Sequence, residues 1–452
     1  MNSLNPLLDF VSAARYETLP EPAKHAARMF LADAVSVGIC GSTEDSAQRV
    51  LRTAASWGKG DAATVLGSGR RLPAASAAFV NSFQVHCQEF DPLHEAATVH
   101  AMAVLSGAVL AIAETEGATG EDLILATALG VEVAVTLGLA AKEGLRFFRP
   151  ATAGALGSTL ALTCLLRLDR ETSLNALGLV YSQLAGTMQA HVEGSVALPV
   201  QIAHAARAAV TAVDLALAGL DGPHDILDGP FGYFTLFERD GSLDTLARSL
   251  GEPWRITELS HKPFPTGRAA HAMLHAMRAL QDQHAFALDD IETVTVTIPP
   301  LVQRLVSRPA RAGMSVNYAR LCLEYLLARL LAAGDIDASA FERPALDDAS
   351  LLAFGSKVAF VEDDTHGIDV LSPQSMCVVL RGGAVVTHDV PHTPGSPDNP
   401  LSREEREHKF SRCVSTAGVD PAPLAEALNE LSAATSAREL LALAASASPR
   451  RH

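Results

Sequence analysis

The chain has 452 residues, of which 48% are hydrophobic and 19% charged, and 35 basic against 51 acidic side chains give it a net charge of −16. This composition excludes a disordered chain, and the negative charge argues against nucleic acid or an anionic membrane as a partner. An anionic substrate would therefore need a local basic pocket. The length predicts two or three domains of about 150 residues each.

Six scattered cysteines without a CxxC pair are typical of a reducing compartment, so we expect a cytoplasmic protein without disulfides. The first residues include Asp9 and Glu17 and lack a basic segment, which argues against a signal peptide. The most apolar long run, residues 197–217, is interrupted by polar side chains such as Arg207 and Asp214. We therefore expect no membrane span.

The first 250 residues follow a helical pattern, with apolar side chains at three-to-four spacing. Thr119, followed three positions later by Asp122, predicts a capped helix start. Alanine and leucine on every face indicate closely packed core helices. The predicted helices cover residues 22–40, 123–139, 156–168, 175–189 and 200–217.

A strand-rich interval follows, over roughly residues 260–395. The stretch IETVTVTI at residues 291–298 alternates threonine with valine or isoleucine, as a half-buried strand does, and Gly382–Gly383 predicts a hairpin turn. Ser402 and Glu405 then form a capping box that opens a final helical segment. Besides residues 291–298, this interval is predicted to contain strands at 357–361, 376–380 and 384–390, a helix at 318–333 and a linker at 391–400.

One segment, NSFQVHCQEFDPLHEAATVHAM at residues 81–102, concentrates proton-transfer groups. Imidazole titrates near neutral pH and carboxylates tune it, so the combination suits general acid–base catalysis. A solvated loop of the same composition is the alternative. The groups are His86, Glu89, Asp91, His94, Glu95 and His100.

A second segment, SHKPFPTGRAAHAML at residues 260–274, places Lys262 and Arg268 around a predicted helix start, which favours anions. Lys262 is a candidate carboxylate-binding or catalytic lysine, and the alternative is a solvated linker residue. His271 and His275 have the spacing of a metal pair but lack an HExxH motif, so no metal is predicted. The stretch GSGRR at residues 67–71 is not a nucleotide-binding motif, and no nucleophile elbow is present. The residues alone indicate an acid–base enzyme without a cofactor.

Several long motifs in order resemble the MmgE/PrpD family, which includes 2-methylcitrate dehydratase, cis-aconitate decarboxylase and iminodisuccinate epimerase. The resemblance implies a mainly α fold: a large all-helical domain from residues 1–258 and 400–452, and a smaller α+β lid domain from residues 259–399. It also implies an active site in the cleft between them and a homodimer without metal. The motifs are ATVLGSGRRLPAASAAFVNS, NSFQVHCQEFD, GATGEDLILATALGVEV, LDGPFGYFTLF, KPFPTGRAAH and DNPLSREEREHKF.

Position by position, the resemblance assigns the family's acid pair to Glu89 and Asp91, its histidine to His100, its lid lysine to Lys262 and its lid tyrosine to Tyr325. Cys322 stands at the serine position of the tyrosine's motif. The chain departs from the family pattern at three further positions, and one residue is inserted before His100. Leu93 replaces a hydroxyl residue, Arg149 a histidine and Leu198 a lysine.

The resemblance implies abstraction of a proton α to a carboxylate of a small anionic acid, by a dehydratase- or decarboxylase-type lyase. His100 is then the expected acid or base, positioned by Asp91 or Glu89, and Tyr325 a proton donor. An epimerase of the iminodisuccinate type and a non-catalytic carboxylate-binding protein are the alternatives. The expected substrate-binding residues, besides Lys262, are Arg149, Arg268, His94 and His271.

Overall fold

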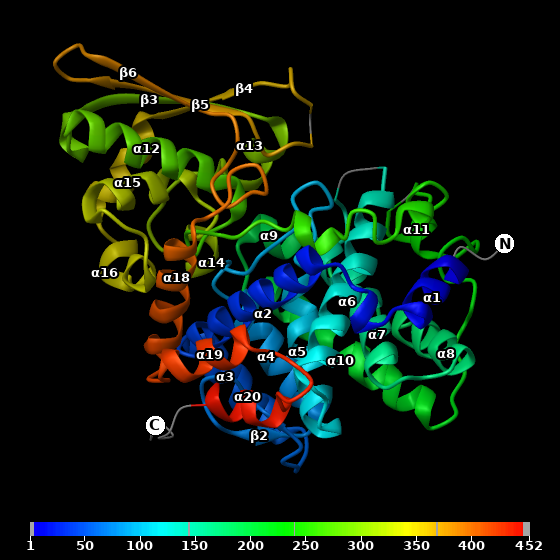
Figure 1. Ribbon diagram of the computed structural model, residues 1–452. Helices are drawn as coiled ribbons and strands as arrows, with labels where there is room; N and C mark the ends of the chain where they lie inside the picture. Colours follow the sequence, from blue (N-terminus) through cyan, green and yellow to red (C-terminus); the bar gives the residue numbers. More distant parts are fainter. Residues whose placement is uncertain (1–3, 143–144, 239, 368, 446–452) are drawn as a thin grey trace.

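The computed structural model describes residues 4–142, 145–238, 240–367 and 369–445. The described chain is mainly α, as the sequence predicts, with helices at both ends of the chain and a small sheet in the interval between them (Figure 1). The N-terminal part contains a two-stranded ladder and helices α1 to α11. Their bounds are α1 Leu4–Ala13, α2 Glu21–Gly41, α3 Asp45–Ser56, β1 Ala63–Thr64, β2 Arg71–Leu72, α4 Ala74–His86, α5 Ala101–Glu116, α6 Gly120–Ala140, α7 Arg149–Leu165, α8 Arg170–Tyr181, α9 Gln189–Glu193, α10 Ala197–Leu217 and α11 Tyr233–Leu236.

Small residues allow the central helices α4, α5, α6, α7 and α10 to pack closely against one another. A Cβ atom added to Gly157 of α7 would lie 2.5 Å from the carbonyl oxygen of Gly130 in α6, so the two backbones nearly touch. The predicted capping box at Thr119 and Asp122 opens α6. By length and composition α6 and α10 could each cross a membrane, but 94% of the tested window in α6 and 56% of that in α10 is buried within the protein, as in core helices.

The last helices return to the N-terminal core. Apolar side chains from the last part of the chain, residues 414–444, share one core with those of residues 4–259. Helices α18 and α19 pack on α2, and α20 packs on α5, so red and blue ribbons lie together in Figure 1. A buried ion pair of 2.8 Å joins Lys409 of α18 to Asp33 of α2. These helices are α18 Arg403–Thr416, α19 Pro421–Asn429 and α20 Ala437–Leu443.

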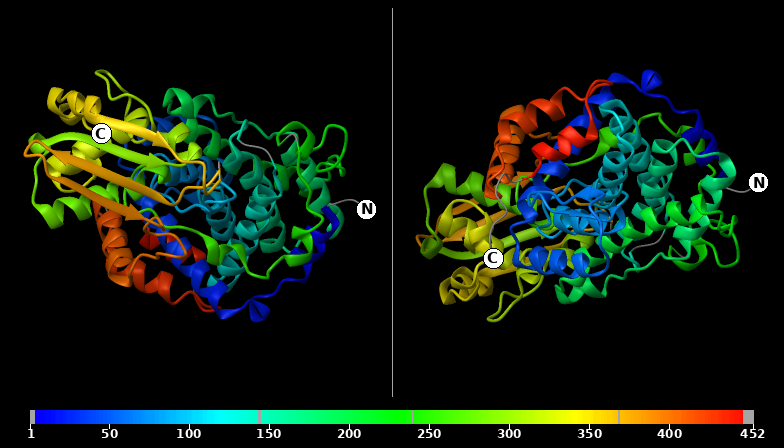
Figure 2. Two further views of the ribbon diagram at one scale, coloured as in Figure 1. Left: turned by 90° about the horizontal axis from the view of Figure 1, so that it is seen from above. Right: turned by 90° about the horizontal axis from the view of Figure 1, so that it is seen from below.

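The intervening segment has its own core, from Phe264 to Val390. Its four strands lie in the order β4-β3-β5-β6; β4 runs parallel to β3, and the other pairs are antiparallel. Helices α12 and α15 cover one face of this sheet, and the view from above in Figure 2 looks onto the other. The elements are α12 His271–His284, β3 Ile291–Ile298, α13 Pro300–Val306, α14 Val316–Ala319, α15 Leu323–Ala333, α16 Arg343–Leu346, α17 Ala349–Phe354, β4 Val358–Glu362, β5 Gln374–Leu380 and β6 Val385–Val390.

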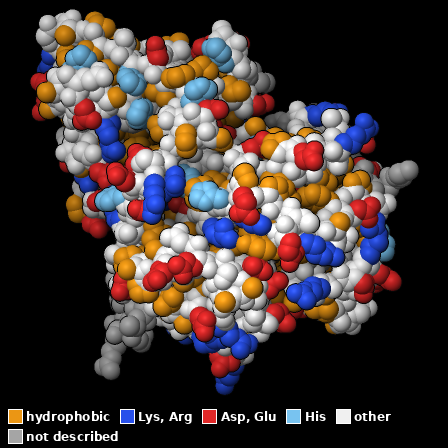
Figure 3. All heavy atoms as spheres, in the orientation of Figure 1, with side chains coloured by type: hydrophobic (Ala, Val, Ile, Leu, Met, Phe, Trp, Pro, Cys, Tyr) orange, Lys and Arg blue, Asp and Glu red, His pale blue; other side chains and the backbone are white. Residues whose placement is uncertain are grey.

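Two predicted helices differ from the structure in ways that affect the site. The helix predicted for 175–189 ends at Tyr181, and the residues beyond it are not helical: Gly186 has a φ of 107°, and the Gln201 side chain accepts a hydrogen bond of 2.6 Å from the Thr187 N–H. The chain then turns into the short helix α9. The helix predicted for 318–333 is broken into α14 and α15. On the face in Figure 3, basic side chains lie among acidic ones and form no continuous basic surface.

Candidate functional site

The loop between α4 and α5 carries most of the proton-transfer groups. His86 is the last residue of α4 and His100 immediately precedes α5, so two buried helices fix the ends of the loop. Within it, Glu89 and Thr98 adopt left-handed φ values of 54° and 51°. Such conformations are costly for residues other than glycine and persist only where the surroundings enforce them, often at functional sites.

Asp91 joins two histidines at the centre of this loop. Its Oδ2 atom lies 2.7 Å from Nδ1 of His100, and its Oδ1 atom lies 3.0 Å from Nδ1 of His86. Asp91 is completely buried. Because an ionised carboxylate only accepts, the Nδ1 atom of His100 carries the hydrogen, and the lone pair of the neutral ring is then on Nε2.

Lys262 reaches this group from the other side of the interdomain boundary. Backbone hydrogen bonds in both directions between Leu93 and Ser260, 2.8 and 3.1 Å long, bring the two segments together. The Lys262 Nζ atom then donates to the backbone oxygen of Glu89 at 2.9 Å and to its carboxylate at 3.0 Å. Lys262 has no exposed surface, so it lies beneath the cleft and is not the solvated linker residue of the alternative interpretation.

We call these five side chains the acid–base cluster: His86, Glu89, Asp91, His100 and Lys262. Burial alone would raise the pKa of the Asp91 carboxyl, but His100, His86 and Lys262 outweigh it and hold that pKa well below its usual range. Burial would also raise the pKa of the Glu89 carboxyl, but the charges of Lys262 and the two histidines outweigh it and lower that pKa to about 2. Both carboxylates are therefore ionised at neutral pH.

The pKa values of the two histidines in the cluster are shifted in opposite directions. Burial and the charge of Lys262 lower the pKa of His100, although Asp91 opposes them. Burial also acts to lower the pKa of His86, but Asp91 and Glu89 together raise it. At neutral pH the cluster thus presents a neutral His100 beside an ionised Asp91, which is the arrangement of a general base with its orienting carboxylate.

A small cavity lies against the cluster, between the N-terminal helices and the lid. Its volume is about 60 Å³, which is room for a few water molecules or part of a small acid. Glu89 and His100 line it, together with Arg268 and His191, and most of its remaining wall is apolar. We call it the cleft cavity.

Both arginines expected to bind substrate carboxylates are held by glutamates of the protein. Nε and Nη2 of Arg149 donate to the two carboxylate oxygens of Glu238 at 3.0 and 2.9 Å, in a buried pair. Arg268 lines the cleft cavity, but its Nε and Nη2 atoms lie 2.9 and 2.7 Å from Oε1 of Glu95. The sequence could not indicate these partners, because Glu238 is 89 positions away from Arg149 and Glu95 173 positions away from Arg268.

Three further expected site residues do not line the cleft cavity. The Nε2 atom of His94 lies 3.2 Å from the Glu258 carboxylate, and Nε2 of His271 lies 3.2 Å from the backbone oxygen of Thr266. Tyr325 is buried in the core of the lid, where its hydroxyl donates to the backbone oxygen of Ala340. Their hydrogen bonds are those of structural residues, which argues against the roles expected for them.

Two further histidines belong to this region. The sequence names His86 among the proton-transfer groups of residues 81–102 without assigning it a role, and in the structure it is the second partner of Asp91. His191 lies on α9 and lines the cleft cavity; burial, with Arg308 second, lowers its pKa to about 4. The prediction of a helix over 175–189 ended just before it and gave no indication of it.

The side chains of His86, Asp91 and His100 could also hold a metal ion, since one donor atom from each lies within 4.8 Å of the others. In the described structure the Nδ1 atoms of both histidines are already directed at Asp91. Lys262 also places a positive charge beside the group, which opposes a second cation. We therefore keep the prediction that no metal is needed.

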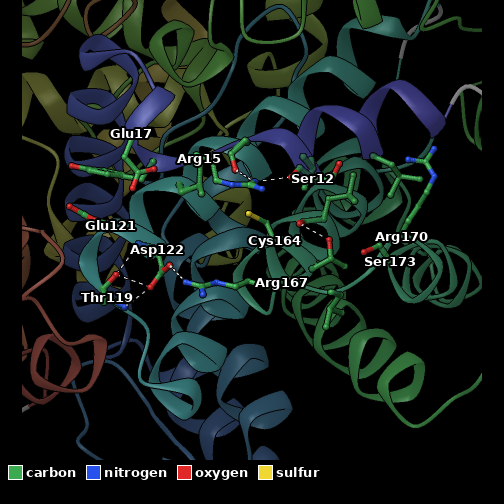
Figure 4. A pocket seen from close by; sticks show the side chains of 18 of the residues that line it. Ser12, Arg15, Glu17, Thr119, Glu121, Asp122, Cys164, Arg167, Arg170 and Ser173 are labelled. Carbon is green, nitrogen blue, oxygen red and sulfur yellow. Dashed lines mark hydrogen bonds and ion pairs between the residues drawn. The ribbon is translucent and has the colours of Figure 1, made fainter.

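A larger cavity, of about 680 Å³, lies elsewhere, among α1, α6, α7 and α8 (Figure 4). No residue of the acid–base cluster lines it. Its charged side chains serve local structure: Arg15 donates to the backbone oxygens of Ser12 and Ala14, and Asp122 caps α6 while facing Arg167 at 3.8 Å. We call it the distal cavity.

Two family models match the chain, one in its N-terminal and one in its C-terminal part. The model of the MmgE/PrpD N-terminal domain matches residues 5–245, and that of the MmgE/PrpD C-terminal domain matches residues 264–430. The chain is 26% identical to the cis-aconitate decarboxylase-like protein oryM of Aspergillus oryzae, over 97% of this chain and 96% of that protein. It is 28% identical to the cis-aconitate decarboxylases of Homo sapiens and Mus musculus, over 85% and 86% of this chain and 81% of each relative. The chain belongs to the MmgE/PrpD family.

Proposed function

We propose that the protein is a lyase of the decarboxylase or dehydratase type that acts on a small carboxylic acid by removing a proton α to a carboxylate. The single observation that carries this proposal is the His86–Asp91–His100 chain, whose last member lines the cleft cavity. The names of the similar curated proteins, which are cis-aconitate decarboxylases, support the same class of reaction.

In this proposal His100 is the base. Asp91 holds the ring through Nδ1, so Nε2 accepts the proton as the C–H bond breaks, and the electron pair moves into the adjacent carboxylate as an enolate-like anion. The positive charge of Lys262 beneath the cleft offsets the charge of Glu89 and Asp91 and so lowers the cost of forming that anion beside His100. Loss of a β-hydroxyl group, which leaves as water with a proton from the site, then gives a dehydratase. In a decarboxylase the electron pair comes instead from the breaking bond to a carboxylate: CO2 leaves, and protonated His100 gives its proton to the carbanion that remains.

His191 supports an epimerase as the second candidate. An epimerase needs a proton donor on the face of the carbon opposite the base, and His191 lines the same cavity from a separate element. Its lowered pKa of about 4 makes it neutral at physiological pH, so it would act as a weak acid or pass on a proton from solvent.

A cytoplasmic homodimer belongs to the same proposal, and sedimentation of the purified protein would test the oligomeric state.

The deciding experiment is NMR detection of proton exchange from D2O into a panel of mono-, di- and tricarboxylic acids. Exchange at the α-carbon that is lost in His100→Ala would support the proposal whichever step follows. CO2 release, water loss or inversion would then identify the lyase or the epimerase. Binding of an acid without exchange of any proton would favour a carboxylate-binding protein and contradict the enzyme.

A further inference from the structure

We infer that the cleft cavity selects an acid with a single carboxylate beside the reacting carbon and a compact apolar remainder, and that it rejects tricarboxylates. This inference rests on the proposed function and concerns the substrate class of the same site. It depends on two features of the cavity wall: the basic side chains in and near it are already bound to other groups of the protein, and most of the side chains that line it are apolar.

The arginine on the wall has no free donor pair for a second substrate carboxylate. Besides its contacts with Glu95, Arg268 donates through Nη1 to the backbone oxygens of His261 and Pro394 and through Nη2 to that of Thr393. All three guanidinium nitrogens are thus occupied by the protein. Among the described residues that line the cavity, Arg268 is the one arginine or lysine.

The other basic residues near the cavity are also engaged. Arg149 makes its paired contact with Glu238, and its Nη1 atom donates to the backbone oxygen of Ala97 at 2.9 Å. Arg308 donates to the backbone oxygens of His191 and Leu305 and lies over the ring of Tyr318. The positive charge beside His100 is that of Lys262, but it is paired with the ionised Glu89, and only Glu89 of this pair lines the cavity. Among the described residues the wall therefore offers no uncommitted cation, so every carboxylate beyond the one at the reacting carbon is unfavourable.

Most of the rest of the wall is apolar, with Glu95 and Thr98 among the exceptions. The apolar side chains come from both domains, and Leu93 and Leu198, which line the cavity, are each only 3% exposed. A second or third carboxylate placed against them would lose its hydration without gaining a partner, which is strongly unfavourable. An alkyl or alkenyl group would gain from the same contact. The apolar residues that define this wall are Leu93, Leu145, Phe148, Leu198, Leu305 and Leu321.

The experiment compares exchange rates for short alkyl monocarboxylates with those for cis-aconitate and citrate, at equal ionic strength. We expect kcat/KM for the best monocarboxylate to exceed that for either tricarboxylate by at least ~10², because each extra carboxylate is left unpaired. Leu198→Lys should raise kcat/KM for the tricarboxylates by roughly 10-fold or more and lower it for the monocarboxylate. Leu217→Lys, on an exposed position of the same helix α10, is the matched control and should change neither.

The possible failures are distinct. If a tricarboxylate exchanges best in the unmodified protein, the substrate class is wrong and the proposed acid–base function stands. If no acid exchanges, the proposed function itself fails. Should Leu198→Lys not fold, as judged by circular dichroism, Leu198→Ala provides the second test: it should admit larger alkyl monocarboxylates and keep the discrimination against tricarboxylates, and equal rates for both classes would overturn the inference.

Discussion

The cleft cavity and the distal cavity differ in a way that size does not reveal. The distal cavity is the larger, about 680 against 60 Å³, and is lined by several charged side chains. Those charges cap helices or bind nearby backbone oxygens, as Arg15 and Asp122 do. The cleft cavity has fewer charges, but two of its lining residues, Glu89 and His100, belong to one coupled cluster in which Asp91 and His100 have shifted pKa values and in whose loop two residues have left-handed φ values. A group of interacting residues with shifted pKa values is therefore a better indication of a catalytic site than the volume of a cavity.

The sharpest test of this contrast is His100→Ala. We expect kcat on the exchanging acid to fall by ~10² or more, because a general base is lost. The melting temperature should also fall, because buried Asp91 loses one of its hydrogen-bond partners, so kcat is measured per folded protein as judged by circular dichroism. His204→Ala, at an exposed position of α10, is the matched control. A normal kcat in His100→Ala would end the assignment of His100 as the base.

The pH dependence of kcat/KM tests the coupling within the cluster. Activity requires neutral His100, so it should be lost as pH falls, with an acidic limb below the ordinary imidazole pKa of about 6.5, because burial and Lys262 lower the pKa of His100. Asp91→Asn removes a charge that raises this pKa and should move the limb to lower pH. Lys262→Met removes a charge that lowers it and should move the limb to higher pH. Shifts in the same direction in both variants would contradict the coupled cluster.

Arg149→Ala separates structure from catalysis. Removal of Arg149 leaves buried Glu238 uncompensated, so the free energy of unfolding should fall by about 3–5 kcal/mol. The folded fraction should keep kcat within a few-fold of wild type. Urea unfolding would measure the first and exchange kinetics the second. Arg403→Ala, which removes an exposed pair with Glu407, is the control and should leave the urea midpoint almost unchanged. A 100-fold loss of kcat with normal stability would instead support the expected role of Arg149 in substrate binding.

Tyr325→Phe should have a smaller effect still. The tyrosine hydroxyl donates to Ala340 within the lid core, so its removal should cost about 1 kcal/mol of stability and leave kcat within a few-fold. Thermal unfolding and kcat together would check this, and a large fall in kcat alone would support the proton-donor role expected from the family resemblance.

The smallest effects should come from the distal cavity and from chelation. Arg15→Ala should leave kcat unchanged, because its guanidinium contacts only local backbone among the described partners.

A chelator should likewise not change kcat, as expected for a cluster whose histidine Nδ1 atoms are bound to Asp91. Metal that copurifies in stoichiometric amount and leaves together with activity would overturn the second expectation.

Local chemistry explains what the sequence predicts well. The capping boxes at Thr119 and Ser402 and the alternation in β3 each depend on a few neighbouring residues, and each has the predicted place. The acid–base cluster is largely local too, since four of its five members lie within 15 consecutive residues, from His86 to His100. The sequence also marks Lys262 as a candidate, but its contact with Glu89 joins residues 173 positions apart and needed the folded chain.

The parts of the site that the sequence did not predict depend on contacts between residues far apart in the chain. The basic character of Arg149 and Arg268 predicted a carboxylate clamp, but only the folded chain shows that Glu238 and Glu95 already fill it. His191 was missed because the turn at Gly186 depends on contacts with Gln201 that no local pattern encodes.

The Lys409–Asp33 pair also has a consequence for the order in which the protein can be completed during synthesis. Lys409 pairs with Asp33 and donates at 3.0 Å to the backbone oxygen of Phe90, which lies between Glu89 and Asp91. A ribosome makes residue 33 hundreds of residues before residue 409, and the whole lid is made in between. Until α18 emerges, the buried carboxylate of Asp33 lacks its cation and the loop with the catalytic groups lacks this anchor. The nascent chain therefore reaches its working form only after the lid and α18 have been translated.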